Sequence, residues 1–194
     1  DGVGRVETLF DLPCYMVGPS GPGSGGPKKA IVLIYDIFGF APPNTRHNCD
    51  TLAEAGFFVI MPDLFRGSGR RDPAFERPTE EAVDTDLYEK VMPFLKAKGY
   101  SVVGLVGFCF GGGVAMRAAT TGLFQACAGA HIANVAPSSS CPSLTARCCV
   151  ARCVSPVDNG VTDSPLCVAR CCQPQACTPR VSTHHRGRSW SGGP

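Results

Sequence analysis

Four apolar segments of strand length alternate with segments of helix length over the first 133 residues. The predicted strands are 30–36 (AIVLIYD), 57–62 (FFVIMP), 101–108 (SVVGLVGF) and 123–132 (LFQACAGAHI). The first three are nearly continuous apolar runs, which is typical of strands buried on both faces. Connections of helix length between such strands indicate parallel pairing, with helices on both faces. We therefore predict an α/β fold, a doubly wound and mostly parallel sheet, whose ligands bind at the carboxyl ends of the strands.

The segments around these strands have recognisable ends. We expect a helix over 45–55, with Asn44 as its N-cap and Gly56 as its stop. A second helix is predicted to begin after Thr79 and to run to about Lys98. Ahead of the Gly/Pro/Ser-rich stretch 18–29, an alternating apolar segment is expected to form one arm of a hairpin.

The hexapeptide Gly107-Phe108-Cys109-Phe110-Gly111-Gly112 stands between a predicted strand and a helix rich in small residues. This is the context of a nucleophile elbow, a sharp turn that presents its central side chain above the sheet edge. Glycines two positions before and two after the central residue are needed, because side chains there would collide. We therefore predict Cys109 as a nucleophile at the positive end of a helix dipole, with the Phe110 amide as an oxyanion donor. The alternative is a cysteine buried as a small apolar residue.

Four segments together resemble the dienelactone hydrolase family of α/β-hydrolases. These are Tyr35-Asp36-Ile37-Phe38-Gly39, Pro43-Asn44-Thr45-Arg46, Met61-Pro62-Asp63-Leu64-Phe65-Arg66-Gly67 and Val106-Gly107-Phe108-Cys109-Phe110-Gly111-Gly112. The resemblance covers about residues 5–133. It implies a monomeric hydrolase without a cofactor that opens a lactone or cleaves a related ester, a small-molecule substrate.

The resemblance also implies roles for three neighbouring residues. Cys109 would attack the carbonyl and form an acyl-enzyme that water hydrolyses. The Ile37 amide would be the second oxyanion donor beside that of Phe110. Asp36 would contact the resting thiol and activate it, although it is one methylene shorter than the glutamate of some members. The alternative role of Asp36 is to cap the turn that follows its strand.

The sequence gives weaker support for a role of the other polar residues in the active site. Substrate carboxylates in this family are held by arginine, and the loop after residue 62 offers Arg66, Arg70, Arg71 and Arg77. The sequence does not choose among them, and the alternative for most of them is a place in a solvated loop. We expect Arg46 to be a helix-surface or loop-bracing residue rather than a substrate ligand, and Asp63 to brace the turn over the site. We expect His131 to be a strand-end histidine, with a place facing the site as its alternative. His47 and Cys49 have no partners at metal-ligand spacing, so no metal site is predicted around them.

Composition changes abruptly after residue 133. Residues 134–194 hold six arginines and two aspartates, a net charge of +4, so the total of +2 leaves −2 for residues 1–133. Eight of the twelve cysteines lie between Cys141 and Cys177. We therefore divide the chain into a hydrolase portion, 1–133, and a Cys/Arg/Pro-rich tail, 134–194. We expect the tail to be disordered or not authentic and the hydrolase fold to be C-terminally incomplete.

The triad acid and histidine are not assigned from the sequence. In this fold they follow the nucleophile on further buried strands, and the tail offers no long β-branched run. Asp158, Asp163, His184 and His185 lie at suitable offsets in a sequence that otherwise does not match the family. Three accounts of the tail stay open: a shifted frame or retained intron, a cysteine metal site built on the repeated Cys-Val-Ala-Arg-Cys, and a disulfide module.

The alternative to an active hydrolase is a truncated fragment or binding protein that keeps the pocket but lacks the triad. A net charge of +2 gives no reason to expect a nucleic-acid or membrane partner. No apolar run reaches the ~20 residues that span a bilayer, and no secretory signal is visible. We therefore expect a cytoplasmic protein, although the N-terminus, Asp1, is not a methionine.

Overall fold

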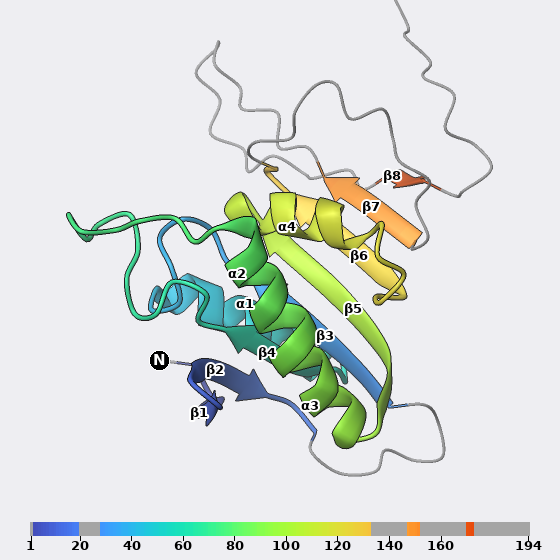
Figure 1. The fold of residues 1–194 in the computed structure, drawn as a ribbon. Helices are drawn as coiled ribbons and strands as arrows, with labels where there is room; N and C mark the ends of the chain where they lie inside the picture. The colour runs from blue at the N-terminus through green and yellow to red at the C-terminus, as the bar shows by residue number, and fades with distance from the viewer. Residues whose placement is uncertain (1, 20–27, 133–146, 152–169, 173–194) are drawn as a thin grey trace, which may run out of the picture.

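The computed structural model describes residues 2–19, 28–132, 147–151 and 170–172 (Figure 1). The strands of this described part form one sheet in the order β1-β2-β4-β3-β5-β6-β7-β8. The strands are β1 (Arg5–Leu9), β2 (Leu12–Val17), β3 (Lys28–Ile34), β4 (Phe58–Pro62), β5 (Tyr100–Phe108), β6 (Ala126–Ala130), β7 (Arg147–Ala151) and β8 (Arg170–Cys172).

The centre of the sheet is parallel, as predicted. β3 pairs in parallel with both β4 and β5, and β6 pairs in parallel with both β5 and β7. The segment expected to be one arm of a hairpin forms a complete hairpin by itself, β1 with β2, and β2 pairs antiparallel with β4. Ile34 lies opposite Gly107, and Gly107 lies opposite Gly129. The carboxyl ends of β3, β5 and β6 therefore meet at one edge of the sheet.

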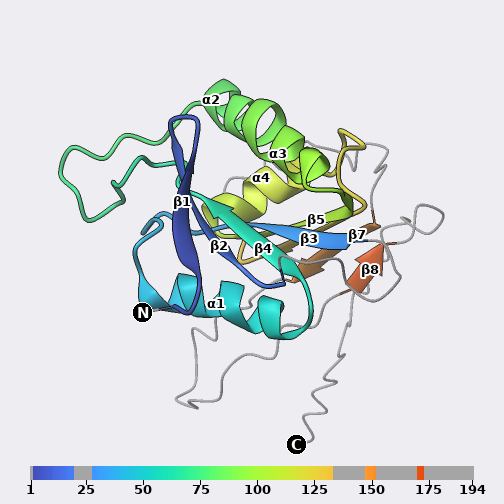
Figure 2. The same ribbon diagram turned by 90° about the horizontal axis from the view of Figure 1, so that it is seen from below.

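Helices cover both faces of this sheet, which confirms the doubly wound architecture (Figure 2). α1 (Pro43–Glu54) packs on one face, against β2 and β4. A continuous helical segment made of α2 (Glu80–Asp84), η1 (Thr85–Val91) and α3 (Met92–Ala97) covers the other face, and α4 (Phe110–Ala118) lies beside it. α4 packs against β3, β5 and β6.

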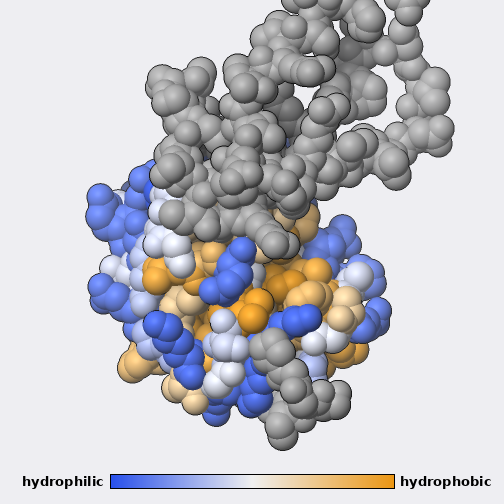
Figure 3. Space-filling view, turned by 90° about the vertical axis from the view of Figure 1, so that its right-hand side faces the viewer, coloured by the Kyte–Doolittle hydropathy of each residue, from blue (hydrophilic) through white to orange (hydrophobic). Residues whose placement is uncertain are grey.

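The core lies between the sheet and these helices. Fully buried residues include Val32 and Ile34 of β3, Ile60 of β4 and Leu87 of η1. Burial of such side chains is the main stabilising contribution to a fold of this kind. Seen from the side where β5, β6 and β7 lie in Figure 1, apolar residues gather at the middle of the surface inside a polar surround (Figure 3).

Of the three helix ends compared in this paragraph, two lie where the sequence predicts them. Thr79 is the N-cap of α2, because its Oγ1 accepts a hydrogen bond from the Ala82 N–H at 3.2 Å. Gly56 follows α1 with a φ of +91°. The prediction of Asn44 as an N-cap is wrong: α1 begins at Pro43, with Pro42 in the cap position and no side-chain cap. Proline at the first helical position has its φ already set for a helix, and this moves the start back.

In the described part of the chain, two further strands lie beyond residue 133, where the sequence shows no long β-branched run. β7 pairs in parallel with β6, and β8 pairs antiparallel with β7. A long β-branched run is typical of a buried strand, whereas β7 is the pentapeptide RCCVA. An unpaired edge of β6 offers a row of N–H and C=O groups, and backbone pairing to that row needs no particular side chains.

Candidate active site

Cys109 joins β5 to α4 at a sharp turn. Its φ is +51° and its ψ is −106°, a conformation that residues other than glycine seldom adopt. The flanking glycines are sterically required. A Cβ on Gly107 would lie 1.9 Å from the Gly111 carbonyl oxygen, and one on Gly111 would lie 2.2 Å from the Ile34 carbonyl oxygen. The turn thus has the shape that the hexapeptide predicted.

Backbone hydrogen bonds fix this turn between two neighbouring strands. The Cys109 N–H donates to the Ala130 carbonyl oxygen at the end of β6, at 2.9 Å. The Gly111 N–H donates to the Tyr35 carbonyl oxygen, just after β3, at 3.1 Å. The Cys109 carbonyl oxygen accepts from the Gly112 N–H at 3.0 Å, which starts α4. The half-buried thiol therefore belongs to the carboxyl edge of the sheet, where ligands bind in this class of fold.

The loop after β3 carries two more of the predicted site residues. Asp36 Oδ1 accepts a hydrogen bond from the Phe38 N–H at 2.8 Å, so the carboxylate caps the turn that follows it. The Ile37 carbonyl oxygen accepts from the Arg70 N–H at 2.8 Å. Because the Gly111 N–H is bonded to Tyr35, this loop lies next to the elbow, and the segments of Asp36, Ile37 and Cys109 are brought together.

Asp63 braces the turn after β4, as expected. It is 3% exposed, its Oδ1 accepts from the Tyr35 hydroxyl at 3.1 Å, and its Oδ2 accepts from the Gly67 N–H at 2.7 Å. The Tyr35 hydroxyl in turn accepts from the Phe65 N–H at 2.9 Å. Sequence reasoning assigned no role to Tyr35, although it lies within one of the motifs that carry the resemblance.

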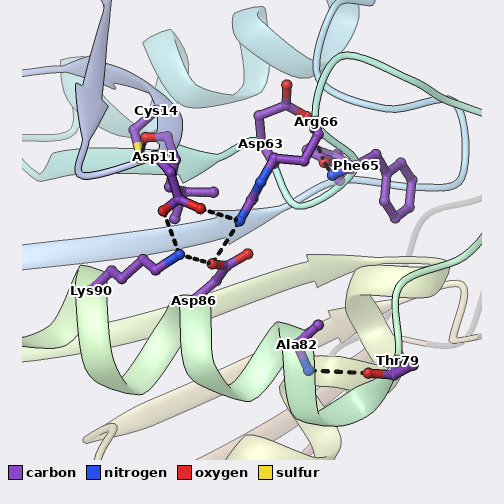
Figure 4. A network of polar contacts seen from close by, with 11 residues as sticks. Asp11, Cys14, Asp63, Phe65, Arg66, Thr79, Ala82, Asp86 and Lys90 are labelled. Atoms are coloured by element: carbon purple, nitrogen blue, oxygen red, sulfur yellow. Dashed lines mark hydrogen bonds and ion pairs between the residues drawn. The ribbon is translucent and has the colours of Figure 1, made fainter.

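Arg66 is held in a network of charges rather than presented to a ligand. Its guanidinium contacts Asp86 Oδ1 at 2.9 Å and Asp11 Oδ2 at 3.6 Å. Lys90 contacts the same two carboxylates, at 2.5 Å for Asp11 and 2.8 Å for Asp86 (Figure 4). These four side chains connect the β1–β2 turn, the loop after β4 and η1. Hydrogen bonding to Asp86 raises the pKa of Arg66, and hydrogen bonding to Asp11 raises that of Lys90.

Three other arginines lie over aromatic rings. Arg46 lies over Tyr15 and Phe40, at 5.5 and 5.3 Å from the ring centroids, which agrees with a bracing role. Arg71 lies 5.7 Å from the ring centroid of Phe38. Arg77 lies 5.8 Å from that of Phe110. Arg77 is therefore the member of the loop set that contacts the residue next to Cys109.

An aromatic cluster packs beside the elbow. The Phe65 ring lies 4.9 Å from that of Tyr35, 4.8 Å from that of Phe75 and 5.0 Å from that of Phe110, between centroids. The sequence analysis missed this cluster. The aromatic residues lie in three separate segments, so no spacing along the sequence predicts that they form a cluster.

The remaining candidates lie in different places. His131 follows β6 directly, is exposed, and has a φ of +50°. His47 is exposed on α1, whereas Cys49 is fully buried, and its sulfur lies 4.0 Å from that of Met61. Burial raises the pKa of Cys49 to about 12, and that of Cys14 also to about 12. Asp158, Asp163, His184 and His185 lie outside the described residues.

The residues that the structure describes offer neither a metal-binding cluster nor a membrane-spanning helix. No group of three or more His, Cys, Asp or Glu side chains that could hold a metal ion was found among the residues that the structure describes. Within the same residues, no helix has the length and apolar character needed to cross a membrane.

The sequence model of the dienelactone hydrolase family matches residues 12–146. The chain belongs to the dienelactone hydrolase family. This family member resembles the carboxymethylenebutenolidase homologue of Mus musculus, with 34% identity over 129 residues that make up 61% of this chain and 51% of the relative. The Homo sapiens homologue is 30% identical over 121 residues, which make up 57% and 47% of the two chains. The chain thus spans about half the length of the curated relatives that it matches.

Solved structures agree on the fold of this family member. A structure described as a putative dienelactone hydrolase from Klebsiella pneumoniae matches with a TM-score of 0.55 and 23% identity, over 71% of this chain and 65% of that one. An α/β serine hydrolase without a lid from Xanthomonas campestris matches with a TM-score of 0.54 and 19% identity, over 77% and 70%. The predicted α/β-hydrolase architecture is therefore confirmed.

Proposed function

We propose that this chain carries the nucleophile half of a hydrolase that opens a lactone or cleaves a related ester, with Cys109 as the nucleophile. The single observation that carries the proposal is the conformation of Cys109. It combines a φ of +51°, a half-buried thiol and two flanking glycines at which a Cβ would clash with the backbone. Strain of this kind is retained where the surroundings enforce it, and it clusters at active sites. Membership of the dienelactone hydrolase family supports the same chemistry.

In the proposed reaction the Cys109 sulfur attacks the carbonyl carbon of the substrate. The carbonyl electrons move to oxygen, and the backbone N–H groups of Ile37 and Phe110 donate hydrogen bonds to that oxyanion. The bond to the leaving oxygen then breaks, and this oxygen takes up the proton that the thiol has lost, so the acylation step balances. Water hydrolyses the resulting thioester and restores the thiol. Phe110 is the first residue of α4, where backbone N–H groups have no partner within the helix.

The proposed role of Asp36 is to activate the resting thiol. Its Oδ1 is already bonded to the Phe38 N–H. Contact with the thiol therefore has to use Oδ2, or the turn has to open. Asp36→Asn separates these roles, because its amide oxygen can still accept from the Phe38 N–H, whereas loss of the negative charge lowers the rate of acylation.

The proposal also covers how the substrate is recognised, the oligomeric state and the compartment. Arg77 is our candidate for a substrate carboxylate, because it lies over the Phe110 ring beside the elbow. We propose a small ester or lactone as the partner, action as a monomer without a cofactor, and a cytoplasmic setting. The triad acid and histidine are not assigned among the described residues. The family match favours a hydrolase over the alternative of a non-catalytic fragment.

The experiment is hydrolysis of p-nitrophenyl acetate by the full chain. We expect continuous release of p-nitrophenol that is lost in Cys109→Ala. The sequence holds eight further cysteines between Cys141 and Cys177. The control is therefore Cys177→Ala, which removes a different thiol and should release p-nitrophenol at the wild-type rate. Release that continues in Cys109→Ala would contradict the proposal. A single turnover that stops would favour the non-catalytic alternative.

A further inference from the structure

Tyr35 stands two residues before Ile37 and is hydrogen-bonded both to the start of α4 and to the turn after β4. Its carbonyl oxygen accepts from Gly111 at the start of α4, at 3.1 Å. Its hydroxyl donates to Asp63 at 3.1 Å and accepts from the Phe65 N–H at 2.9 Å. The side chain is fully buried, so its hydroxyl has no water to replace these partners. Burial also raises the pKa of Tyr35, so the hydroxyl keeps its proton as a donor.

The turn that Tyr35 holds is packed directly against the loop of Ile37. The Arg70 N–H donates to the Ile37 carbonyl oxygen at 2.8 Å. A Cβ on Gly69 would lie 2.6 Å from the Phe38 carbonyl oxygen, and one on Gly39 would lie 2.7 Å from the Ser68 carbonyl oxygen. The two backbones are therefore in contact, with no side chain between them that could absorb a shift of either loop.

We propose that the Tyr35 hydroxyl is a positioning group that sets the Ile37 N–H at its distance from the Phe110 N–H. This inference rests on the proposed function. The hydroxyl fixes Asp63 and Phe65, these fix the turn that ends at Arg70, and that turn fixes the loop of Ile37. The Phe110 side of the hole is held separately, by backbone bonds of the elbow. The hydroxyl therefore acts on one donor relative to the other.

The variant that tests this is Tyr35→Phe. It keeps the ring that packs 4.9 Å from Phe65, and it removes the hydrogen bonds to Asp63 and Phe65. A displacement of about 1 Å in a catalytic group can lower a rate about 100-fold. We expect acetylation of Cys109 by p-nitrophenyl acetate to slow by at least about tenfold, mostly through the rate of acylation rather than through KM.

Tyr15→Phe is a matched control. The Tyr15 hydroxyl is also buried, donates to a carboxylate, that of Asp50, at 2.7 Å, and accepts from a backbone N–H, that of Gly4, at 2.6 Å. It lies on β2 beside α1, away from the elbow. We expect Tyr15→Phe to lower the melting temperature as Tyr35→Phe does, but to leave the acetylation rate of Cys109 unchanged.

A second reaction separates positioning from general damage to the thiol. Alkylation of Cys109 by iodoacetamide develops no oxyanion, so it does not need the Ile37 N–H. Both reactions are followed by mass spectrometry on the peptide that carries Cys109, because the chain has twelve cysteines. We expect Tyr35→Phe to slow acetylation and to leave alkylation unchanged.

Gly69→Ala is a second variant, in case Tyr35→Phe does not fold. Its Cβ forces the same two loops apart without touching Tyr35, so we expect the same pattern of rates. Equal slowing of both reactions, or acetylation in Tyr35→Phe as fast as in Tyr15→Phe, would overturn the inference. If the wild-type chain itself is not acetylated at Cys109, the proposed function fails, and this result is distinct from a failure of the Tyr35 variant alone.

Discussion

A Cβ atom on Gly107 would stand 1.9 Å from the carbonyl oxygen of Gly111, although the two residues are separated by the whole of the elbow. We predict that Gly107→Ala and Gly111→Ala each lower the free energy of unfolding by about 3 kcal/mol or more, because the backbone has to shift to admit the methyl group. Urea unfolding followed by circular dichroism measures this.

Gly104→Ala is the matched control on the same strand. Its Cβ would meet nothing closer than 3.6 Å, an ordinary contact. We expect this substitution to be neutral or to stabilise by about 0.5 kcal/mol, since alanine has less conformational freedom to lose on folding. Equal destabilisation at positions 104 and 107 would mean that the elbow is not the tight turn described above.

The network of Asp11, Arg66, Asp86 and Lys90 predicts a pH-dependent contribution to stability. The pKa of Asp11 lies below its ordinary value of 3.8, and the main cause is the hydrogen bond between Asp11 and Lys90. A group whose pKa is lowered on folding stabilises the folded state above its unfolded-state pKa. We therefore expect Asp11→Asn to be less stable than the wild type at pH 5–8, and the difference to vanish as the pH falls below 3.8.

The measurement for Asp11 is the free energy of unfolding as a function of pH, at low salt and in 1 M NaCl. Asp11 is exposed, so salt should reduce the difference by screening. Glu76→Gln, which removes an exposed carboxylate of the loop after β4 that lies outside this network, is the control. A difference between wild type and Asp11→Asn that grows at low pH would contradict the assignment.

The position of Arg77 over Phe110 predicts a preference for substrates that bear a carboxylate. We expect Arg77→Gln to raise KM for p-nitrophenyl hemisuccinate about tenfold, the size of one lost hydrogen bond to a charged group. KM for p-nitrophenyl acetate should stay within about twofold, because that ester has no carboxylate to bind. Arg5→Gln, on the edge strand β1, is the control. A parallel rise of KM for both esters would rule out carboxylate recognition by Arg77.

His131 and Phe10 share a backbone feature, since both have a positive φ, of +50° and +59°. Glycine adopts this conformation without the steric penalty of a side chain. We expect His131→Gly and Phe10→Gly each to raise the free energy of unfolding by about 1 kcal/mol. We also expect both variants to retain the esterase rate, in accord with a structural histidine at the strand end. A loss of turnover confined to His131→Gly would instead assign the imidazole to the reaction.

The sequence by itself determined the parallel α/β core and the elbow. Both depend on signals that are local along the chain, namely continuous apolar runs in the strands and glycines at fixed offsets from Cys109. The signal for Thr79 as a helix cap is also local, because its hydroxyl accepts a hydrogen bond from an N–H only three residues away. For Asn44, a competing local rule, proline at the first helical position, decided where α1 begins.

Tertiary structure decided what depends on distant partners. The strands beyond residue 133 pair with an edge of β6 that exists only once the sheet has formed. Arg66 and Arg77 belong to one loop, but charges from the β1–β2 turn and η1 hold the first, and the ring of Phe110 lies under the second. The Tyr35 hydroxyl meets Asp63 across 28 residues of sequence. Hydrophobic periodicity along the sequence does not predict such a contact, because the contact forms only when two strands pack side by side.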